Sequence, residues 1–153
     1  IVHIDNVTIG LKMKVFSLLI VFSLFFIPLD NENETYSKVN QYTALEQSIK
    51  RGKEVYMDMC VTCHLPNGEG VPKVYPPLAK SDYLIGKREA SIKAIKYGIR
   101  GKIVVNGVEY RGIMTSLGLY DDEVADVMNY ITNSWGNKNP KMITEEEVSK
   151  IEK

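Results

Sequence analysis

The sequence predicts a small all-α domain of three to five helices with one short β-hairpin. Three stretches favour this fold class. Residues 45–59 read as a helix, apolar side chains recur at i, i+3, i+4 and i+7 from Val124 to Ile131, and Asn106-Gly107 divides an alternating run that is typical of a hairpin. At 153 residues the chain has room for one such domain and not for two.

The chain before this domain divides into three parts. Residues 1–12 do not begin with methionine and precede a possible initiator at Met13, so we interpret them as an upstream extension. Residues 13–29 contain a lysine followed by an uncharged apolar run, which indicates a signal peptide or an N-terminal membrane anchor. Residues 30–43 are polar and show no period, which predicts a flexible linker.

The domain itself is expected over residues 44–140, and its first helix over residues 45–59. Gly52 lies in the middle of that helix, where a glycine costs about 1 kcal/mol relative to alanine. The cost makes sense if another helix crosses closely at this point.

Both cysteines of the chain and one of its two histidines lie in the pentapeptide "CVTCH", residues 60–64. A structural zinc would need four ligands, and no second cysteine pair completes them. A thioredoxin-like redox pair would follow a strand, whereas the residues before Cys60 favour a helix. A disulfide between two residues this close would stabilise the fold little.

A covalently bound haem accounts for all three side chains. On a helical turn Cys60, Cys63 and His64 project from one face. Two thioether bonds would hold the porphyrin edge while the imidazole binds the iron, and C-x-x-C-H is the signature of this attachment. We therefore expect one haem c with His64 as a ligand of its iron. His3 falls in the upstream extension and leaves His64 as the only histidine of the domain.

Met114 is the expected second ligand of that iron. Of the other methionines after residue 44, two directly precede the pentapeptide, one belongs to an apolar helical stripe and one lies in a charged tail. They are Met57, Met59, Met128 and Met142. Met114 lies in a loop with glycines on both sides, and a methionine thioether is a usual haem ligand in electron carriers.

Local signals predict the elements between the pentapeptide and the hairpin. Residues 65–80 are dense in glycine and proline and predict a loop. Ser81 can cap a short helical turn, and residues 87–97 read as a helix that ends at Gly98.

The remaining elements follow the hairpin. A helix with one buried face is expected after residue 120, and residues 141–153 are expected to form a C-terminal tail with a short helix. Thr144 and Glu147 are spaced as a capping box for that short helix.

The stretches "GKEVYMDMCVTCHLPNGEG", "PPL" and "GIMTSLGLYDDEVADVMNYITNSWGN" resemble the class I cytochrome c family over about residues 46–135. The resemblance implies a small cytochrome c fold around a covalent haem. It also implies that the backbone carbonyl of Pro76 accepts the Nδ1 proton of the haem histidine, and that Tyr130 packs on Gly52.

The chain departs from the family pattern at two positions. Thr115 follows Met114 where the family often has proline, so the loop of Met114 is expected to be less rigid. Tyr120 stands where the last helix usually has a serine or threonine N-cap, so Asp121 is expected to cap that helix instead.

The resemblance implies a monohaem c-type cytochrome that carries single electrons and catalyses no reaction itself. Its partners would be periplasmic or membrane redox proteins: a dehydrogenase, a reductase or a terminal oxidase. The protein would be periplasmic, with a possible membrane tether through residues 15–29. Two alternatives stay open: a haem subunit or domain of such a complex, and a haem enzyme or gas sensor with a labile sixth ligand and Arg111 as its distal group.

Charge is unevenly distributed along the chain. Residues 50–111 carry twelve Lys and Arg against six Asp and Glu, and residues 112–153 carry four against eight. Six basic residues come from segments expected near the haem opening, where they would steer an acidic partner or simply form a solvated face. They are Lys73, Lys80, Lys87, Arg88, Lys93 and Lys96. A net charge of zero makes nucleic acid a poor candidate.

Overall fold

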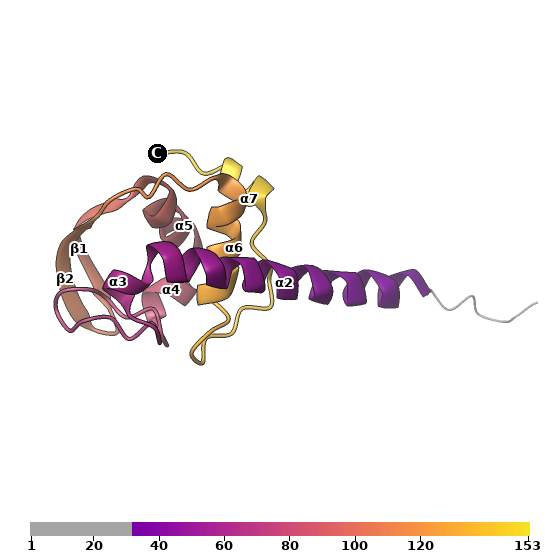
Figure 1. The fold of residues 1–153 in the computed structure, drawn as a ribbon, viewed down its shortest axis with the longest axis horizontal. Helices are drawn as coiled ribbons and strands as arrows, with labels where there is room; N and C mark the ends of the chain where they lie inside the picture. The colour runs from indigo at the N-terminus through magenta and orange to yellow at the C-terminus, as the bar shows by residue number, and fades with distance from the viewer. Residues whose placement is uncertain (1–31) are drawn as a thin grey trace, which may run out of the picture. The chain divides into compact units, whose positions relative to one another are not determined.

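The computed structural model describes residues 32–153, with side chains from Thr43 onward. Its elements are α2 (Glu32–Met59), α3 (Val61–His64), α4 (Asp82–Gly86), α5 (Arg88–Tyr97), β1 (Ile99–Val105), β2 (Val108–Met114), α6 (Asp121–Ile131) and α7 (Glu145–Ser149) (Figure 1). Residues 38–153 form one compact unit, which contains every described element except the start of α2. The extension and the signal or anchor segment expected over residues 1–29 lie outside the described residues.

Residues 32–153 are mostly helical and contain one two-stranded antiparallel sheet, which agrees with the predicted class. This part of the chain has six helices where three to five were expected, because α3, α4 and α7 are short turns of four or five residues. None of these helices has the length and apolar character that a membrane crossing requires.

Helix α2 is longer than the sequence suggested. It begins at Glu32, so most of the expected linker over residues 30–43 is helical. That segment contains neither glycine nor proline, and nothing in it ends a helix that already runs through residues 45–59. Apolar residues at helical spacing are needed for a helix to pack against a core. They are not needed for an existing helix to continue into a polar segment.

Helices α2 and α6 cross at Gly52. A Cβ atom built there would lie 1.9 Å from the carbonyl oxygen of Asp126, so only glycine fits. The Asp126 carboxylate accepts hydrogen bonds from Ser48 Oγ at 2.6 Å and from Arg51 Nε at 2.5 Å. The backbone nearest Gly52 is therefore that of Asp126, one turn before Tyr130.

Tyr130 belongs to an aromatic cluster with Tyr56 and Trp135. Their ring centroids lie 5.4 Å apart for Tyr56 and Tyr130, 5.0 Å for Tyr56 and Trp135, and 5.3 Å for Tyr130 and Trp135. The apolar core continues around this cluster with residues from α4, α5, α6 and the C-terminal segment. Its fully buried members include Ile92, Val124, Val127, Met128, Ile143 and Val148.

The hairpin forms where it was predicted. Strands β1 and β2 pair from Ile99 with Met114 to Val105 with Val108. Asn106 and Gly107 turn the chain with φ of 51° and 77°, the two positive values that a two-residue hairpin turn of this type needs. Met114 is consequently the last residue of β2 and not a residue of a free loop.

Helix α6 is capped differently from the expectation. Its N-cap is Tyr120, and Asp121 is the first helical residue. The Glu123 carboxylate accepts a hydrogen bond from the backbone N–H of Tyr120 at 2.9 Å. A glutamate three positions into the helix makes this half of a capping box whatever side chain the N-cap carries.

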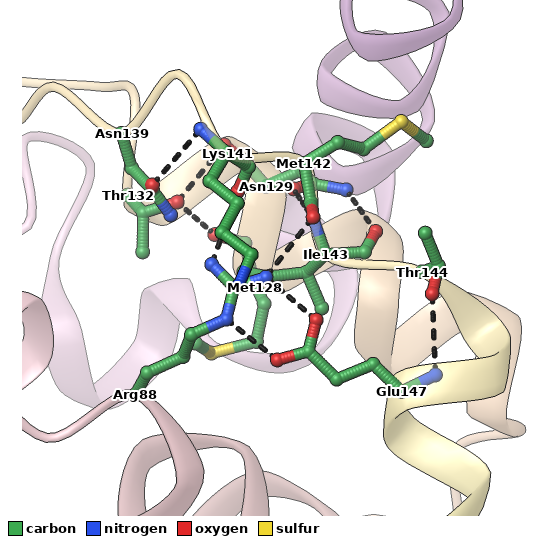
Figure 2. Close-up of polar contacts among 10 residues, drawn as sticks. All are labelled: Arg88, Met128, Asn129, Thr132, Asn139, Lys141, Met142, Ile143, Thr144 and Glu147. Carbon is green, nitrogen blue, oxygen red and sulfur yellow. Dashed lines mark hydrogen bonds and ion pairs between the residues drawn. The ribbon is translucent and has the colours of Figure 1, made fainter.

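The C-terminal segment, residues 141–153, packs into the core. Ile143 and Val148 are fully buried and Ile151 is 8% exposed. The side-chain amide of Asn129 pairs with the backbone of Ile143 in both directions, because its Nδ2 donates to the carbonyl and its Oδ1 accepts from the N–H, each at 2.8 Å (Figure 2). The segment expected as a tail is thus part of the folded unit.

Arg88 at the start of α5 holds the same segment. It donates to the backbone carbonyls of Lys141 and Met142 at 3.0 Å and pairs with the Glu147 carboxylate at 2.6 Å (Figure 2). Thr144 caps α7 as predicted, since its Oγ1 accepts from the backbone N–H of Glu147 at 3.2 Å. The Glu147 side chain binds Arg88 and so does not complete the capping box.

Candidate functional site

The pentapeptide forms a helical turn directly after α2. The backbone N–H groups of Cys63 and His64 donate to the carbonyl of Cys60 at 3.2 and 3.0 Å. This turn brings the side chains of all three residues to the wall of one pocket. Burial raises the pKa of the Cys60 thiol to about 11, with the neighbouring Cys63 adding to the effect. A redox-active thiol has a lowered pKa, so this geometry disfavours a thioredoxin-like pair.

His64 is 9% exposed, and its Nδ1 lies 3.0 Å from the backbone carbonyl oxygen of Pro76. This contact suits an Nδ1–H donor, which leaves Nε2 with the lone pair that a metal ligand needs. Burial lowers the pKa of His64, and the hydrogen bond that its Nδ1–H donates to the carbonyl of Pro76 opposes that shift. The ring is therefore held in the neutral form near pH 7.

The loop that carries Pro76 is fixed by Gly70, a residue that sequence reasoning did not single out. Gly70 has a φ of +63°, and a Cβ there would lie 2.4 Å from the carbonyl oxygen of Tyr75 and 2.7 Å from that of Pro76. Its N–H donates to the carbonyl of His64 at 3.0 Å. One glycine thus joins the histidine turn to the proline segment. The glycines of "NGEG" indicated only a loop, and nothing local showed which segment would come close.

Met114 lines the same pocket as Cys60, Cys63, His64 and Pro76. It is half-buried at the end of β2 and is the only methionine among the described residues that line the pocket. The other candidates lie elsewhere: Met57 and Met59 are each 46% exposed on α2, and Met128 is fully buried in the core.

The pocket is partly open to solvent, and side chains from α2 to α6 and both strands form its walls. Most of these side chains are apolar, among them Leu78, Ile95, Ile103, Val127 and Ile131. A flat apolar group with polar edges suits a pocket with this lining.

One buried hydroxyl points to an occupant with a hydrogen-bonding group. The Oγ atom of Ser91, on α5, is buried at the pocket wall and has no hydrogen-bond partner within the described part of the chain. Buried polar groups in folded proteins are nearly always paired. The thiols, the imidazole, the apolar walls and this hydroxyl together fit a haem, whose propionates can accept a hydrogen bond.

Three of the basic residues proposed to surround the opening have partners within the chain. Arg88 binds Glu147, and Lys96 lies 2.9 Å from the Asp121 carboxylate and donates to the carbonyl of Val148 at 2.9 Å. The Nζ atom of Lys87 lies 4.9 Å from the centre of the Tyr83 ring. Four of the six side chains are exposed: Lys73, Lys80, Lys87 and Lys93.

Comparison with known proteins agrees with the geometry. The family model for cytochrome c matches residues 49–135. The chain is 40% identical over 109 residues to cytochrome c-552 of Thermus thermophilus, which covers 65% of this chain and 82% of that protein. It is 30% identical over 131 residues to the cytochrome c subunit of a quinone alcohol dehydrogenase from Gluconacetobacter polyoxogenes, covering 82% of this chain but only 28% of the subunit. The cytochrome c subunit of a gluconate 2-dehydrogenase from Pantoea cypripedii is also 30% identical, over 106 residues.

Proposed function

Because this chain belongs to the cytochrome c family, whose members bind haem c covalently, we propose that it is a monohaem carrier that passes single electrons between redox proteins. The observation that carries the proposal is that both cysteines, the histidine and one methionine line a single apolar pocket. The haem supplies the iron that changes oxidation state, and the protein supplies its ligands and its apolar surroundings.

The roles of the site residues are part of this proposal. Cys60 and Cys63 would form the thioether bonds, His64 would bind the iron through Nε2, and Met114 would be its second ligand. The carbonyl of Pro76 orients the imidazole, which the 3.0 Å contact to Nδ1 supports. A haem with both axial positions filled exchanges electrons with little rearrangement, which suits a carrier.

A catalytic role is the weaker alternative. It would require a side chain that can transfer protons on the side of the haem opposite His64, and Arg111 was the candidate predicted from the sequence. In the structure Arg111 is exposed, pairs with Glu109 at 2.5 Å and is not part of the pocket wall. This supports a carrier over a haem enzyme.

The partner and the location also remain proposals. We propose a periplasmic carrier, and the similarity to two dehydrogenase subunits supports a haem subunit of such a complex as the alternative. A dehydrogenase, reductase or terminal oxidase with an acidic surface would be its partner, and the four exposed lysines support this.

The first test is the absorbance spectrum of the exported protein, recorded oxidised, reduced, and reduced under carbon monoxide. A carrier shows haem bands that carbon monoxide leaves unchanged, because Met114 fills the sixth position. A spectrum that shifts with the gas would favour an enzyme or sensor, and the absence of haem bands would refute the proposed site.

A further inference from the structure

We infer that Gly98 and Ser116 are positioning residues that hold Met114 in place as an axial ligand. This inference rests on the function proposed above, in which Met114 binds the iron. Thr115 follows Met114, so no proline ring restrains the backbone directly after the ligand. The structure offers a different restraint, which comes from the C-terminal end of α5.

Gly98 ends α5 and lies directly against the backbone around Met114. Its φ is +81°, and a Cβ at this position would lie 2.6 Å from the carbonyl oxygen of Met114 and 2.9 Å from the backbone nitrogen of Ser116. Neither atom is a flexible side chain that could move aside. Only glycine combines this φ with this approach, so the backbone of Met114 rests on the end of the helix.

Ser116 also holds the residues after Met114 against the end of α5. Its Oγ donates to the carbonyl of Lys96 at 2.8 Å and accepts from the N–H of Gly118 at 3.5 Å. The carbonyl of Lys96 lies in the last turn of α5, where carbonyls lack a partner within the helix. The hydroxyl therefore satisfies a helix end and ties the residues after Met114 to it.

Helix α5 is a firm support for these contacts. Ile92 and Ile95 bury one of its faces in the core, and the side chain of Lys96 binds both Asp121 and the carbonyl of Val148. Ser91 and Ile95 of the same helix line the pocket. The helix that supports Met114 therefore also forms a wall of the pocket that Met114 lines.

The test measures how quickly added imidazole binds the ferric iron of the haem-loaded, full-length protein. Imidazole can bind only after Met114 has left the iron, so its binding rate reports how firmly Met114 is held. Ser116→Ala should raise this rate about two- to tenfold, the range expected for losing one hydrogen bond. Gly98→Ala should raise it by more than about tenfold, because strain at φ of +81° adds to the clash.

Two further variants serve as controls. Ser116→Thr keeps the hydroxyl and should bind imidazole at the wild-type rate. Gly86→Ala tests a glycine at which an added Cβ meets no atom within 4 Å, and it should also behave as wild type. The rates at which carbon monoxide binds the reduced variants should follow the same order as the rates of imidazole binding.

The outcomes separate this inference from the proposed function. If Met114→Ala binds imidazole no faster than wild type, Met114 is not the ligand and both ideas fail. If Met114→Ala binds quickly while Gly98→Ala and Ser116→Ala match wild type, only the positioning role is wrong. A lowered unfolding temperature with an unchanged imidazole rate would mean that the two residues serve stability alone. Should Gly98→Ala fail to fold, the pair Ser116→Ala and Ser116→Thr decides the question.

Discussion

Three glycines in this chain are required because another backbone segment lies too close for any side chain. Gly52 meets the backbone of α6, Gly70 meets the proline segment, and Gly98 meets the backbone of Met114. The sequence suggested a close crossing at Gly52, because a glycine inside a helix needs a reason. The sequence did not predict the close contacts at Gly70 or Gly98, because a glycine in a loop or at a helix end is already explained by the local turn of the backbone.

The substitution Gly52→Ala should destabilise the haem-loaded protein. The added methyl group would lie 1.9 Å from the carbonyl oxygen of Asp126, so α2 and α6 must separate. The expected loss in the free energy of unfolding is about 3 kcal/mol, the upper end of ordinary overpacking. Urea unfolding followed by circular dichroism measures it, with Gly86→Ala as the matched control. Equal stability of the two variants would contradict the close crossing.

The substitution Gly70→Ala should raise the reduction potential. Its Cβ would displace the carbonyl of Pro76, and the weakened hydrogen bond would leave the imidazole of His64 less electron-rich. Loss of one such bond corresponds to a rise on the order of 20–60 mV. Potentiometric titration checks it. An unchanged potential in a folded variant would show that the carbonyl does not tune the ligand.

At the scale of elements, predictions succeeded where the signal was local. The turn at Asn106-Gly107, the end of α5 at Gly98 and the cap at Ser81 were each specified within a few residues, and each is present. The predicted start of α2 was wrong, because the helix extends through a polar segment that contains no residue that would end it. The predicted N-cap of α6 was also wrong, because Glu123 accepts the hydrogen bond from the backbone N–H of Tyr120 and Tyr120 is the N-cap.

Deleting residues 141–153 should destabilise the domain by several kcal/mol. The deletion removes the buried side chains of Ile143, Val148 and Ile151, each worth roughly 1.5–3 kcal/mol, and leaves the amide of Asn129 without the backbone of Ile143. Thermal unfolding of the haem-loaded protein tests this. A deletion of the last two residues, Glu152 and Lys153, which are exposed, is the control and should leave stability unchanged. An unaffected unfolding temperature in the longer deletion would mean that the segment does not hold the core.

The contact between α5 and α7 should depend on pH. The hydrogen bond from Arg88 holds the pKa of Glu147 below its ordinary value of 4.5. A carboxyl group with a lowered folded-state pKa stabilises the protein above pH 4.5, and this contribution is lost as the pH falls through the lowered pKa.

The variant Glu147→Gln tests that dependence. It should be less stable than wild type by about 1 kcal/mol at pH 7, because the ion pair is partly exposed, and the difference should disappear in acid. Urea unfolding across the pH range measures it, with Glu145→Gln in the same helix as control. A stability difference that persists at pH 2 would rule out the ion pair as its cause.

At the scale of the whole molecule, the haem pocket replaces part of the core. Its walls come from elements throughout residues 56–131, and they surround space that no side chain fills. A domain of this size already buries limited apolar surface. The pentapeptide alone predicts the haem site, whereas the pocket around it depends on contacts between distant segments and could not be predicted from the sequence.

The polypeptide without haem should therefore be largely unfolded. The double variant Cys60→Ser and Cys63→Ser, which cannot form the thioether bonds, should lose most of its far-UV circular dichroism once free haem is removed. The haem-loaded wild type is the control. A cooperative thermal transition in the haem-free variant would show that the polypeptide folds by itself.

The position of the C-terminal segment also has a consequence for biosynthesis. Ile143, Val148 and Ile151 are synthesised after α5 and α6, and yet these helices need them to close the core. A nascent chain that has emerged only as far as α6 therefore lacks part of the interior of this domain. Folding of the domain is expected to wait until residue 151 has left the ribosome, and a stop codon between residues 141 and 148 should yield a product that proteases remove.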